Sequence, residues 1–195
     1  MEKLIFCDAT HEYFIDGVKK PSVTDICEPL NTGLTKLPKY VLENARQRGT
    51  AIHEYANALA CDIEDLEVTT SVINYAKWFK SWWNAERPKV IFAEVKLFGN
   101  DFCGTADLVA EISGITYLID YKTSSVMNKV SLSAQLYGYK TLLESKGIKI
   151  DKCACLHIKK DNYPTFKEIE PDKQLFESLL YVWQKLNIKE KKNAK

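Results

Sequence analysis

Hydrophobic and polar positions change their period about halfway along the chain. Apolar residues recur at helical spacing in two long segments, residues 38–60 and 69–86. Pro88 ends this helical section, and beyond it apolar residues run continuously or alternate, which is typical of strands. The pattern therefore predicts helices in the first half of the chain and a sheet in the second.

The second half predicts strands interrupted by one helix and closed by another. The expected strands cover residues 89–99, 102–112, 115–123, 152–160 and 165–170. Between the third and the fourth strand, a helix from about Asn128 to Lys146 is expected to stop at Gly147. Pro171 opens a final helix that continues into a lysine-rich tail. The order β-β-β-α-β with helical cover predicts a mixed α/β sheet.

The first twenty residues predict a small β unit ahead of the helices. Two short strands joined by a turn are expected, and Asp16-Gly17 marks a second turn. Ser22 and Asp25 follow with the residue types and spacing of a helix start, because serine caps the first turn and an acid favours the positive end of the helix dipole.

Length and composition are those of an ordinary globular chain. With 195 residues, one domain with a real core is expected. It would comprise a hairpin and helices (1–87), a sheet core (88–170) and a C-terminal helix with a basic tail (171–195). Hydrophobic residues make up 46% and charged residues 27%, which excludes a disordered chain. The net charge of +1 gives no global basic field of the kind that attracts nucleic acid.

Neither a membrane span nor a targeting segment is predicted. No apolar run approaches the roughly 20 residues that cross a bilayer, and the N-terminus fits neither a signal peptide nor a transit peptide. A cytoplasmic protein without a membrane partner is expected. The six cysteines include no CxxC pair that would indicate zinc or redox chemistry, so reduced, mainly structural thiols are expected. They are Cys7, Cys27, Cys61, Cys103, Cys153 and Cys155.

A two-residue loop, Ser113-Gly114, is the expected turn between the second and third strands of the sheet. With this loop, the numbers of directly opposed residues sum to 227, and Asp107 faces Asp120. Opposed residues have Cβ atoms about 5 Å apart, and like charges at that distance destabilise a sheet. Since side chains alternate along a strand, Asp120 and Lys122 share the face that Asp107 joins from its neighbour.

This convergence of two acids and one ammonium group has two interpretations. A divalent cation with oxygen ligands would relieve the repulsion between Asp107 and Asp120, and Lys122 beside it could hold or activate a water molecule. Alternatively, the three residues form a surface salt-bridge cluster that binds no ligand.

Four short motifs resemble those of the PD-(D/E)XK nuclease superfamily, and specifically its RecB-like branch. They cover about 90 residues in the order of that branch. The matching segments are GTAIH (Gly49–His53) for a GxxxH helix, GTAD (Gly104–Asp107) for a GxxD strand, DYK (Asp120–Lys122) for the D/E-x-K strand, and Gln135 with Tyr139 for a QxxxY helix.

The resemblance implies a restriction-endonuclease-like αβββαβ core with a helical N-terminal elaboration. It also implies that Mg²⁺ or Mn²⁺ is bound by His53, Asp107 and Asp120 together with the backbone carbonyl of Tyr121. Lys122 would orient the attacking water or stabilise charge on the phosphate. Some members of the branch carry an iron-sulfur cluster on one upstream and three downstream cysteines. The downstream trio is missing here, so no cluster is expected.

Further residues have both a functional and a structural interpretation. Glu94, on the first strand of the sheet, is either an additional acid near the metal or an edge-strand charge. Gln135 and Tyr139 lie at i and i+4 on one helix face, where they either pack at the edge of the core or brace the site and contact DNA. Gly49 and Thr123 are candidates for supporting the site or binding DNA.

The expected activity is that of a metal-dependent DNA nuclease. An exonuclease that acts on DNA ends or single strands in phage or bacterial recombination, repair or replication fits the resemblance, and it would work in the cytoplasm of a bacterial or phage-infected cell. Trp78, Trp82 and Trp83 either stack on bases of a single strand or belong to the core. An endonuclease of restriction or junction-resolving type and a non-catalytic nucleic-acid-binding protein on the same fold remain alternatives.

Overall fold

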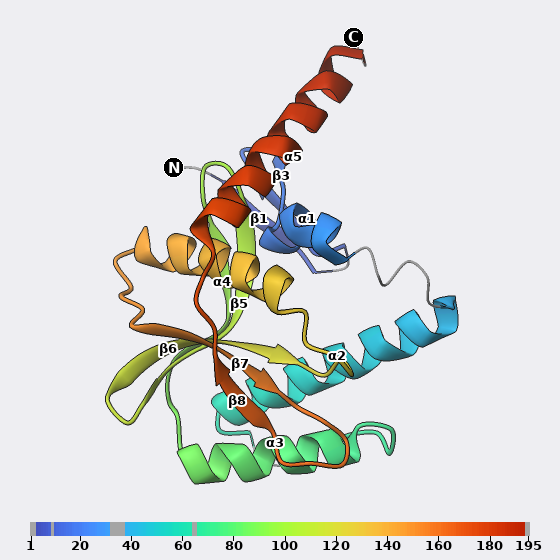
Figure 1. Ribbon diagram of the computed structural model, residues 1–195, viewed down its shortest axis with the longest axis vertical. Helices are drawn as coiled ribbons and strands as arrows, with labels where there is room; N and C mark the ends of the chain where they lie inside the picture. The colour runs from blue at the N-terminus through green and yellow to red at the C-terminus, as the bar shows by residue number, and fades with distance from the viewer. Residues whose placement is uncertain (1–2, 9, 32–37, 64–65, 194–195) are drawn as a thin grey trace.

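The computed structural model describes residues 3–8, 10–31, 38–63 and 66–193, and side chains up to residue 186 (Figure 1). The last two residues of the lysine-rich tail therefore lie outside the described part. In chain order the elements are β1 (Leu4–Cys7), β2 (Glu12–Ile15), β3 (Val18–Lys20), α1 (Val23–Cys27), α2 (Lys39–Ala60), α3 (Ile73–Glu86), β4 (Lys89–Phe98), β5 (Cys103–Ile112), β6 (Ile115–Lys122), α4 (Lys129–Glu144), β7 (Lys152–His157), β8 (Thr165–Glu168) and α5 (Lys173–Asn193).

A five-stranded mixed sheet forms the centre of the fold. Its strands lie in the order β4-β5-β6-β7-β8, and β6 and β7 are parallel while the other neighbours are antiparallel. The parallel pair requires a crossover connection, and α4 supplies it. The mixed α/β sheet that the sequence predicts is confirmed, and its order contains the expected β-β-β-α-β unit.

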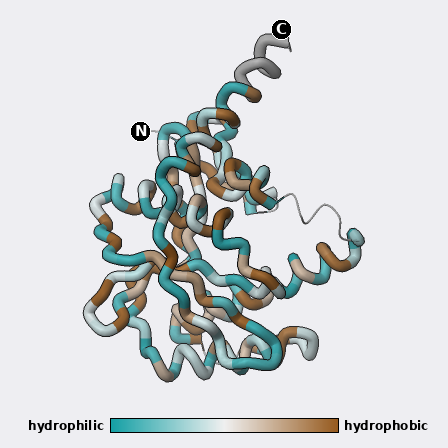
Figure 2. The backbone as a smooth tube through the Cα atoms, in the orientation of Figure 1, coloured by the Kyte–Doolittle hydropathy of each residue, from teal (hydrophilic) through white to brown (hydrophobic). Residues whose placement is uncertain are grey.

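Helices cover both faces of this sheet and bury a hydrophobic core on each. One core joins α1, α4 and α5 to the sheet, and the other joins α2 and α3 to it. Alternation along the central strands divides their side chains: Val109 and Leu118 belong to the first core, and their neighbours Leu108 and Ile119 to the second. Figure 1 shows the sheet between these two layers, and Figure 2 shows hydrophobic segments along its central strands.

The N-terminal unit is larger than the sequence predicts. Three antiparallel strands, not two, form the sheet β1-β2-β3, because the chain pairs again after the Asp16-Gly17 turn. Asp16 and Gly17 have φ angles of 50° and 77°, the left-handed conformation of a tight hairpin turn. The predicted helix start is confirmed, since Ser22 and Asp25 form a reciprocal capping box at α1.

Two helices begin later than their sequence patterns predict. Helix α3 begins at Ile73, after a turn that covers the first residues of the predicted segment 69–86. Helix α5 begins at Lys173 and not at Pro171. Asp172 caps its first turn, because the Asp172 carboxylate accepts a hydrogen bond from the backbone N–H of Leu175. The ends of α2 and of α4 agree with the prediction to within two residues.

The tryptophan stripe of α3 is core more than surface. Trp82 is 1% exposed and stacks on Phe166 of β8, with ring centroids 5.8 Å apart. Trp83 and Trp78 are half-buried, and Trp78 meets the ring of Tyr163 edge-on. Trp82 therefore belongs to the core, and its indole is not available to stack on a base.

None of the helices within the described residues combines the length and the apolar character that crossing a membrane requires.

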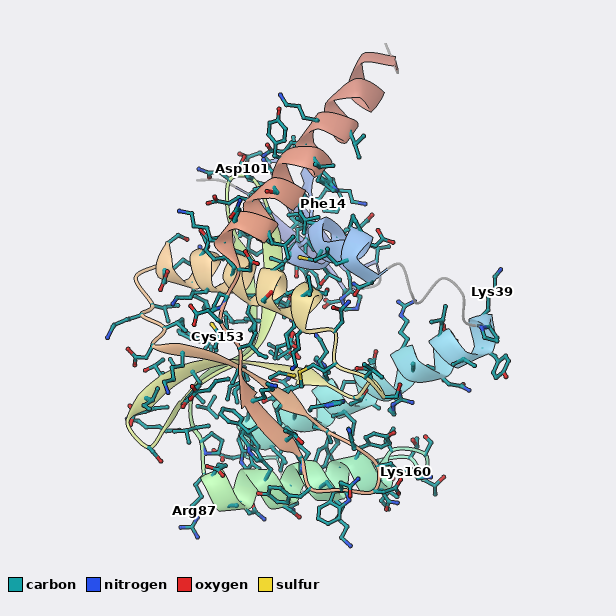
Figure 3. All side chains as sticks on the ribbon, in the orientation of Figure 1. Phe14, Lys39, Arg87, Asp101, Cys153 and Lys160 are labelled. Atoms are coloured by element: carbon teal, nitrogen blue, oxygen red, sulfur yellow. The ribbon has the colours of Figure 1, made fainter. Side chains whose placement is uncertain are left out.

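The cysteines differ sharply in exposure, and this predicts their reactivity. Cys27, Cys103, Cys153 and Cys155 are buried, and Figure 3 shows Cys153 in the interior between α4 and the sheet. Burial raises the pKa of Cys27 and of Cys153 to about 12. Because the thiolate is the reactive form, these thiols should resist alkylation. Cys61, after α2, is exposed.

We expect iodoacetamide at pH 8 to label Cys61 first in the folded protein, while the four buried thiols stay unlabelled for hours. Mass spectrometry of tryptic peptides gives the order of labelling, and the same reaction in guanidinium chloride should label all six. Rapid labelling of Cys153 or Cys155 in the folded protein would contradict the packing of β7 against α4.

Candidate metal and nuclease site

The strands β5 and β6 pair in the register that the two-residue turn predicts. Ser113-Gly114 has φ angles of 51° and 81°, and the ladder runs from this turn to the pair Leu108–Ile119. Asp107 and Asp120 occupy the next position along the two strands. The sequence therefore places both carboxylates at one end of the central sheet.

The two carboxylates relieve their repulsion through different partners. Asp107 accepts a hydrogen bond from the backbone N–H of Tyr121 at 2.7 Å, and its other oxygen lies 3.4 Å from Nδ1 of His53. Asp120 pairs with Lys122, whose Nζ lies 2.8 Å from one carboxylate oxygen and 2.6 Å from the other. Each acid thus has its own cationic neighbour before any metal binds.

Burial and these pairings move the pKa values in opposite directions. Burial raises the pKa of Asp120 above its usual value, and Lys122 offsets this shift only in part. Burial acts on Asp107 as well, but His53 and Lys122 outweigh it and hold the pKa of Asp107 below its usual value. Burial lowers the pKa of Lys122, yet Asp120 and Asp107 raise it overall, so Lys122 stays charged.

His53 reaches this sheet end from helix α2, which packs on the opposite face from α4. Its Nε2 donates to the backbone carbonyl of Tyr121 at 3.3 Å, which leaves Nδ1 directed at Glu94 and Asp107, 3.4 Å from an oxygen of each. Burial lowers the pKa of His53, but Asp107 and Glu94 raise it well above its usual value. A metal-binding histidine commonly donates its second N–H to a carbonyl in this way.

Glu94 has an unusual backbone conformation in the middle of β4. Its φ of 46° lies in the left-handed region, which costs a non-glycine residue about 1–3 kcal/mol. Its carboxylate nevertheless lies beside His53, and ligand atoms of His53, Glu94 and Asp107 all fall within 4.8 Å of one another. From the sequence alone, Glu94 could be either an acid of the site or a charge on an edge strand. The structure places it inside the cluster, and Asp120 outside it.

The donors present fit a divalent cation. Two buried carboxylate oxygens, Oε1 of Glu94 and Oδ2 of Asp120, make no hydrogen bond with the described residues, although each has an ionic neighbour, His53 and Lys122 respectively. Leaving such oxygens unsatisfied is costly, and Mg²⁺ and Mn²⁺ prefer carboxylate ligands. The Tyr121 carbonyl, expected as a ligand, accepts the His53 hydrogen bond and retains a second lone pair.

One pocket of about 480 Å³ brings most of the predicted site together. Its walls include His53, Glu94, Asp107, Asp120, Lys122, Gln135 and Tyr139. Gly49 and Thr123 are not among the residues that line it. They face each other instead, because a Cβ atom on Gly49 would lie 3.9 Å from the Thr123 hydroxyl.

The glycine of the GTAD segment has a packing role. A Cβ atom on Gly104 would lie 2.7 Å from the ring of Tyr139, closer than real Cβ contacts come. The close approach of β5 and α4 at this point places Tyr139 on the pocket wall, where its hydroxyl shares a 3.4 Å hydrogen bond with Thr24. The contact between Gly104 and the Tyr139 ring therefore joins the GxxD segment to the QxxxY segment.

Sequence reasoning missed two groups of residues that line the pocket. Arg46 and Thr50 lie on the same face of α2 as His53, seven and three residues before it, so helical spacing could have found them. Tyr13 comes from the N-terminal sheet, and its hydroxyl lies 2.7 Å from that of Thr105 on β5. No spacing rule links these two positions, because 92 residues separate them.

We expect Mn²⁺ to stabilise the protein through the His53–Glu94–Asp107 cluster. At about ten to a hundred times its Kd, Mn²⁺ should raise the melting temperature by roughly 3–10 °C, because it binds only the folded state. The isosteric change Glu94→Gln removes one charged ligand and should abolish most of this shift, as differential scanning fluorimetry in EDTA and in Mn²⁺ would measure.

Glu111→Gln is the matched control, since Glu111 lies on the neighbouring strand β5 and faces Lys89 at 3.8 Å. It should keep the full shift. Equal shifts in the two variants, or no shift in the wild type, would show that the cluster binds no cation.

Comparisons with known proteins find similarity at the level of solved structures. No protein-family model matches the chain, and no curated protein matches it. A crystal structure described as "Putative exonuclease" from Eubacterium rectale superposes with a TM-score of 0.46 at 11% identity, over 71% of this chain and 63% of that one. The structure of SSO0001 superposes with a TM-score of 0.38 at 15% identity, over 82% and 81% of the two chains. The chain thus spans less than two thirds of the first protein, and both likenesses are too distant to assign a function.

Proposed function

We propose that the protein is a metal-dependent DNA nuclease that hydrolyses phosphodiester bonds. One observation supports this most directly: a histidine and two carboxylates, His53, Glu94 and Asp107, cluster beside the Asp120–Lys122 ion pair in one pocket. The motif order described above adds to this geometry. A surface salt-bridge cluster would instead leave the charges in solvent, whereas Asp120 here is buried.

The charged residues would have different roles in this reaction. A bound Mg²⁺ or Mn²⁺ would be held by His53, Glu94 and Asp107, and it supplies Lewis acidity at the phosphoryl group. Lys122 remains protonated beside Asp120 and lies at the pocket wall, where its ammonium group can hold a water molecule or neutralise phosphate charge. Asp120, which also lines the pocket, fixes the position of that ammonium group.

Hydroxyl groups that line the same pocket suit a sugar-phosphate substrate. Tyr13, Thr24 and Thr105 line the pocket together with Arg46. Hydroxyl and guanidinium groups are common donors to phosphate oxygens, and such contacts position a nucleic acid without reading its sequence. These local donors would bind DNA although the net charge of the chain is only +1. Exonuclease action on ends or single strands is the form of the activity that we favour, on the resemblance of the motifs.

Cleavage should depend on both the metal and the Asp120–Lys122 pair. We expect wild-type protein with Mg²⁺ or Mn²⁺ to degrade end-labelled linear DNA, and Asp120→Asn or Lys122→Met to lower the rate at least about a hundredfold, the usual effect of losing one charge-stabilising group. Lys149→Met is the control, because Lys149 is exposed and pairs with Asp151 at 2.7 Å on the protein surface. Labels at the 5′ and 3′ ends would give the direction of digestion.

A covalently closed circle separates the alternatives within this activity. An exonuclease is expected to degrade linear strands and leave circles intact. Cutting of the circle would show an endonuclease instead. If wild type and Asp120→Asn were equally inactive on every substrate with either metal, the nuclease proposal would be rejected in favour of a binding role.

A further inference from the structure

A second cavity of about 380 Å³ adjoins the proposed nuclease pocket. Lys122 and Gln135 line both, so the two cavities meet at the end of β6. The second cavity lies between the β6–α4 connection, the first turns of α4 and the residues that follow α1. Anything that occupied it would be a direct neighbour of a group bound at Lys122.

The chemistry of the second cavity differs from that of the first. Hydroxyl and charged groups line the nuclease pocket, whereas the second cavity has mainly apolar walls. The side chains of Leu30, Val126, Met127 and Leu132 form these walls. Val126 is 77% exposed, which is unusual for valine and leaves an apolar surface at the cavity for an occupant to cover.

Two polar side chains of α4 that are largely buried also line the cavity. Ser131 and Gln135, one helical turn apart on α4, are only 4% and 7% exposed. The backbone N–H of Ser131 donates to Asn128, but neither the Ser131 hydroxyl nor the Gln135 amide makes a hydrogen bond with the part of the chain that the structure describes. Neither group is among the fully buried polar atoms that lack a partner, so both can pair with an occupant of the cavity that has hydrogen-bonding edges.

The cavity wall is held in place before any occupant binds. Nε2 of His157 donates to the carbonyl of Ser124 at 2.6 Å, and the Ser124 hydroxyl donates to the carbonyl of Val126 at 2.8 Å. Asn128 caps α4 and also donates to the carbonyl of Leu30 at 3.0 Å. These bonds fix both ends of the β6–α4 connection, and a preformed cavity binds its ligand without the cost of ordering it.

We propose that this cavity binds one unpaired nucleobase, that of the nucleotide next to the phosphate held at Lys122. A nucleobase has apolar faces for Val126 and Leu132 and polar edges for Ser131 and Gln135, and a cavity of this volume is within the range of small-ligand sites. The inference rests on the proposed nuclease function for the phosphate, and it deepens that function by naming the substrate.

Single-stranded DNA is the substrate class that this arrangement selects. A base in a duplex is stacked and paired, and it enters a protein cavity only after extrusion from the helix, which costs several kcal/mol. A base in a single strand or at a frayed end meets no such cost. The cavity therefore favours single strands and frayed ends over the interior of a duplex.

The test compares binding of a strand with bases and a strand without them, in EDTA so that no cleavage occurs. Fluorescence anisotropy would give the Kd for a labelled oligothymidylate and for the same backbone built from abasic tetrahydrofuran units. We expect wild-type protein to prefer the strand with bases roughly tenfold or more, as for other single-strand binding surfaces.

Val126→Ala and Val130→Ala form a matched pair of variants. Both valines are well exposed, so neither change threatens the fold, but only Val126 lines the cavity. We expect Val126→Ala to reduce the preference for bases at least threefold and Val130→Ala to keep it. Equal preferences in the two variants, or no preference in the wild type, would overturn the inference. Ser131→Leu, which fills the cavity, should remove the preference if its melting temperature shows that it folds.

The cleavage assay and the binding assay fail independently of each other. Cleavage without any preference for bases would reject the nucleobase site and keep the nuclease. A preference for bases that Val126→Ala reduces, together with no cleavage in Mg²⁺ or Mn²⁺, would reject the nuclease and keep the nucleobase site.

Discussion

The pairing of β5 with β6 is the constraint on which the rest of this site depends. Because the turn between the strands has two residues, the ladder runs to the pair Leu108–Ile119, and Asp107 and Asp120 follow it at one end of the sheet. Two carboxylates at one sheet end need positive charge. The fold supplies it from within the sheet, through Lys122, and from outside it, through His53 on α2.

The need for positive charge near the two carboxylates explains why helices on both faces of the sheet contribute to one pocket. Lys122 needs only the alternation of its own strand to reach Asp120, but His53 belongs to a helix that packs on the opposite face from α4. The hydrogen bond from His53 to the carbonyl of Tyr121 fixes the ring at the sheet end. Helix α4 contributes from its own face, where the contact of Gly104 with Tyr139 sets how closely it approaches.

The same pocket also contains the clearest local departure from regular structure. Glu94 has a left-handed backbone conformation inside a ten-residue strand, which folding would avoid unless the surrounding pairs imposed it. Its carboxylate then lies where a second acidic oxygen completes a cluster with His53 and Asp107. Strain of this kind is concentrated at functional sites in proteins, and here it coincides with a buried oxygen that has no hydrogen-bond partner among the described residues.

The sequence by itself determined the elements and the local geometry of this protein. Periodicity predicted the mixed sheet and the helices on it, and the two-residue turn predicted the register that brings Asp107 and Asp120 to one end of the sheet, because both depend on neighbours in the chain. The sequence did not predict the third strand of the N-terminal sheet or the later starts of α3 and α5. Several positions fit the sequence pattern at these places, and strand pairing and helix capping decide which of them is used. Only the tertiary structure decided that Glu94 joins His53, that Tyr13 reaches the pocket, and that a second cavity adjoins it. These contacts join segments far apart in the sequence, and packing, which no local pattern records, brings them together.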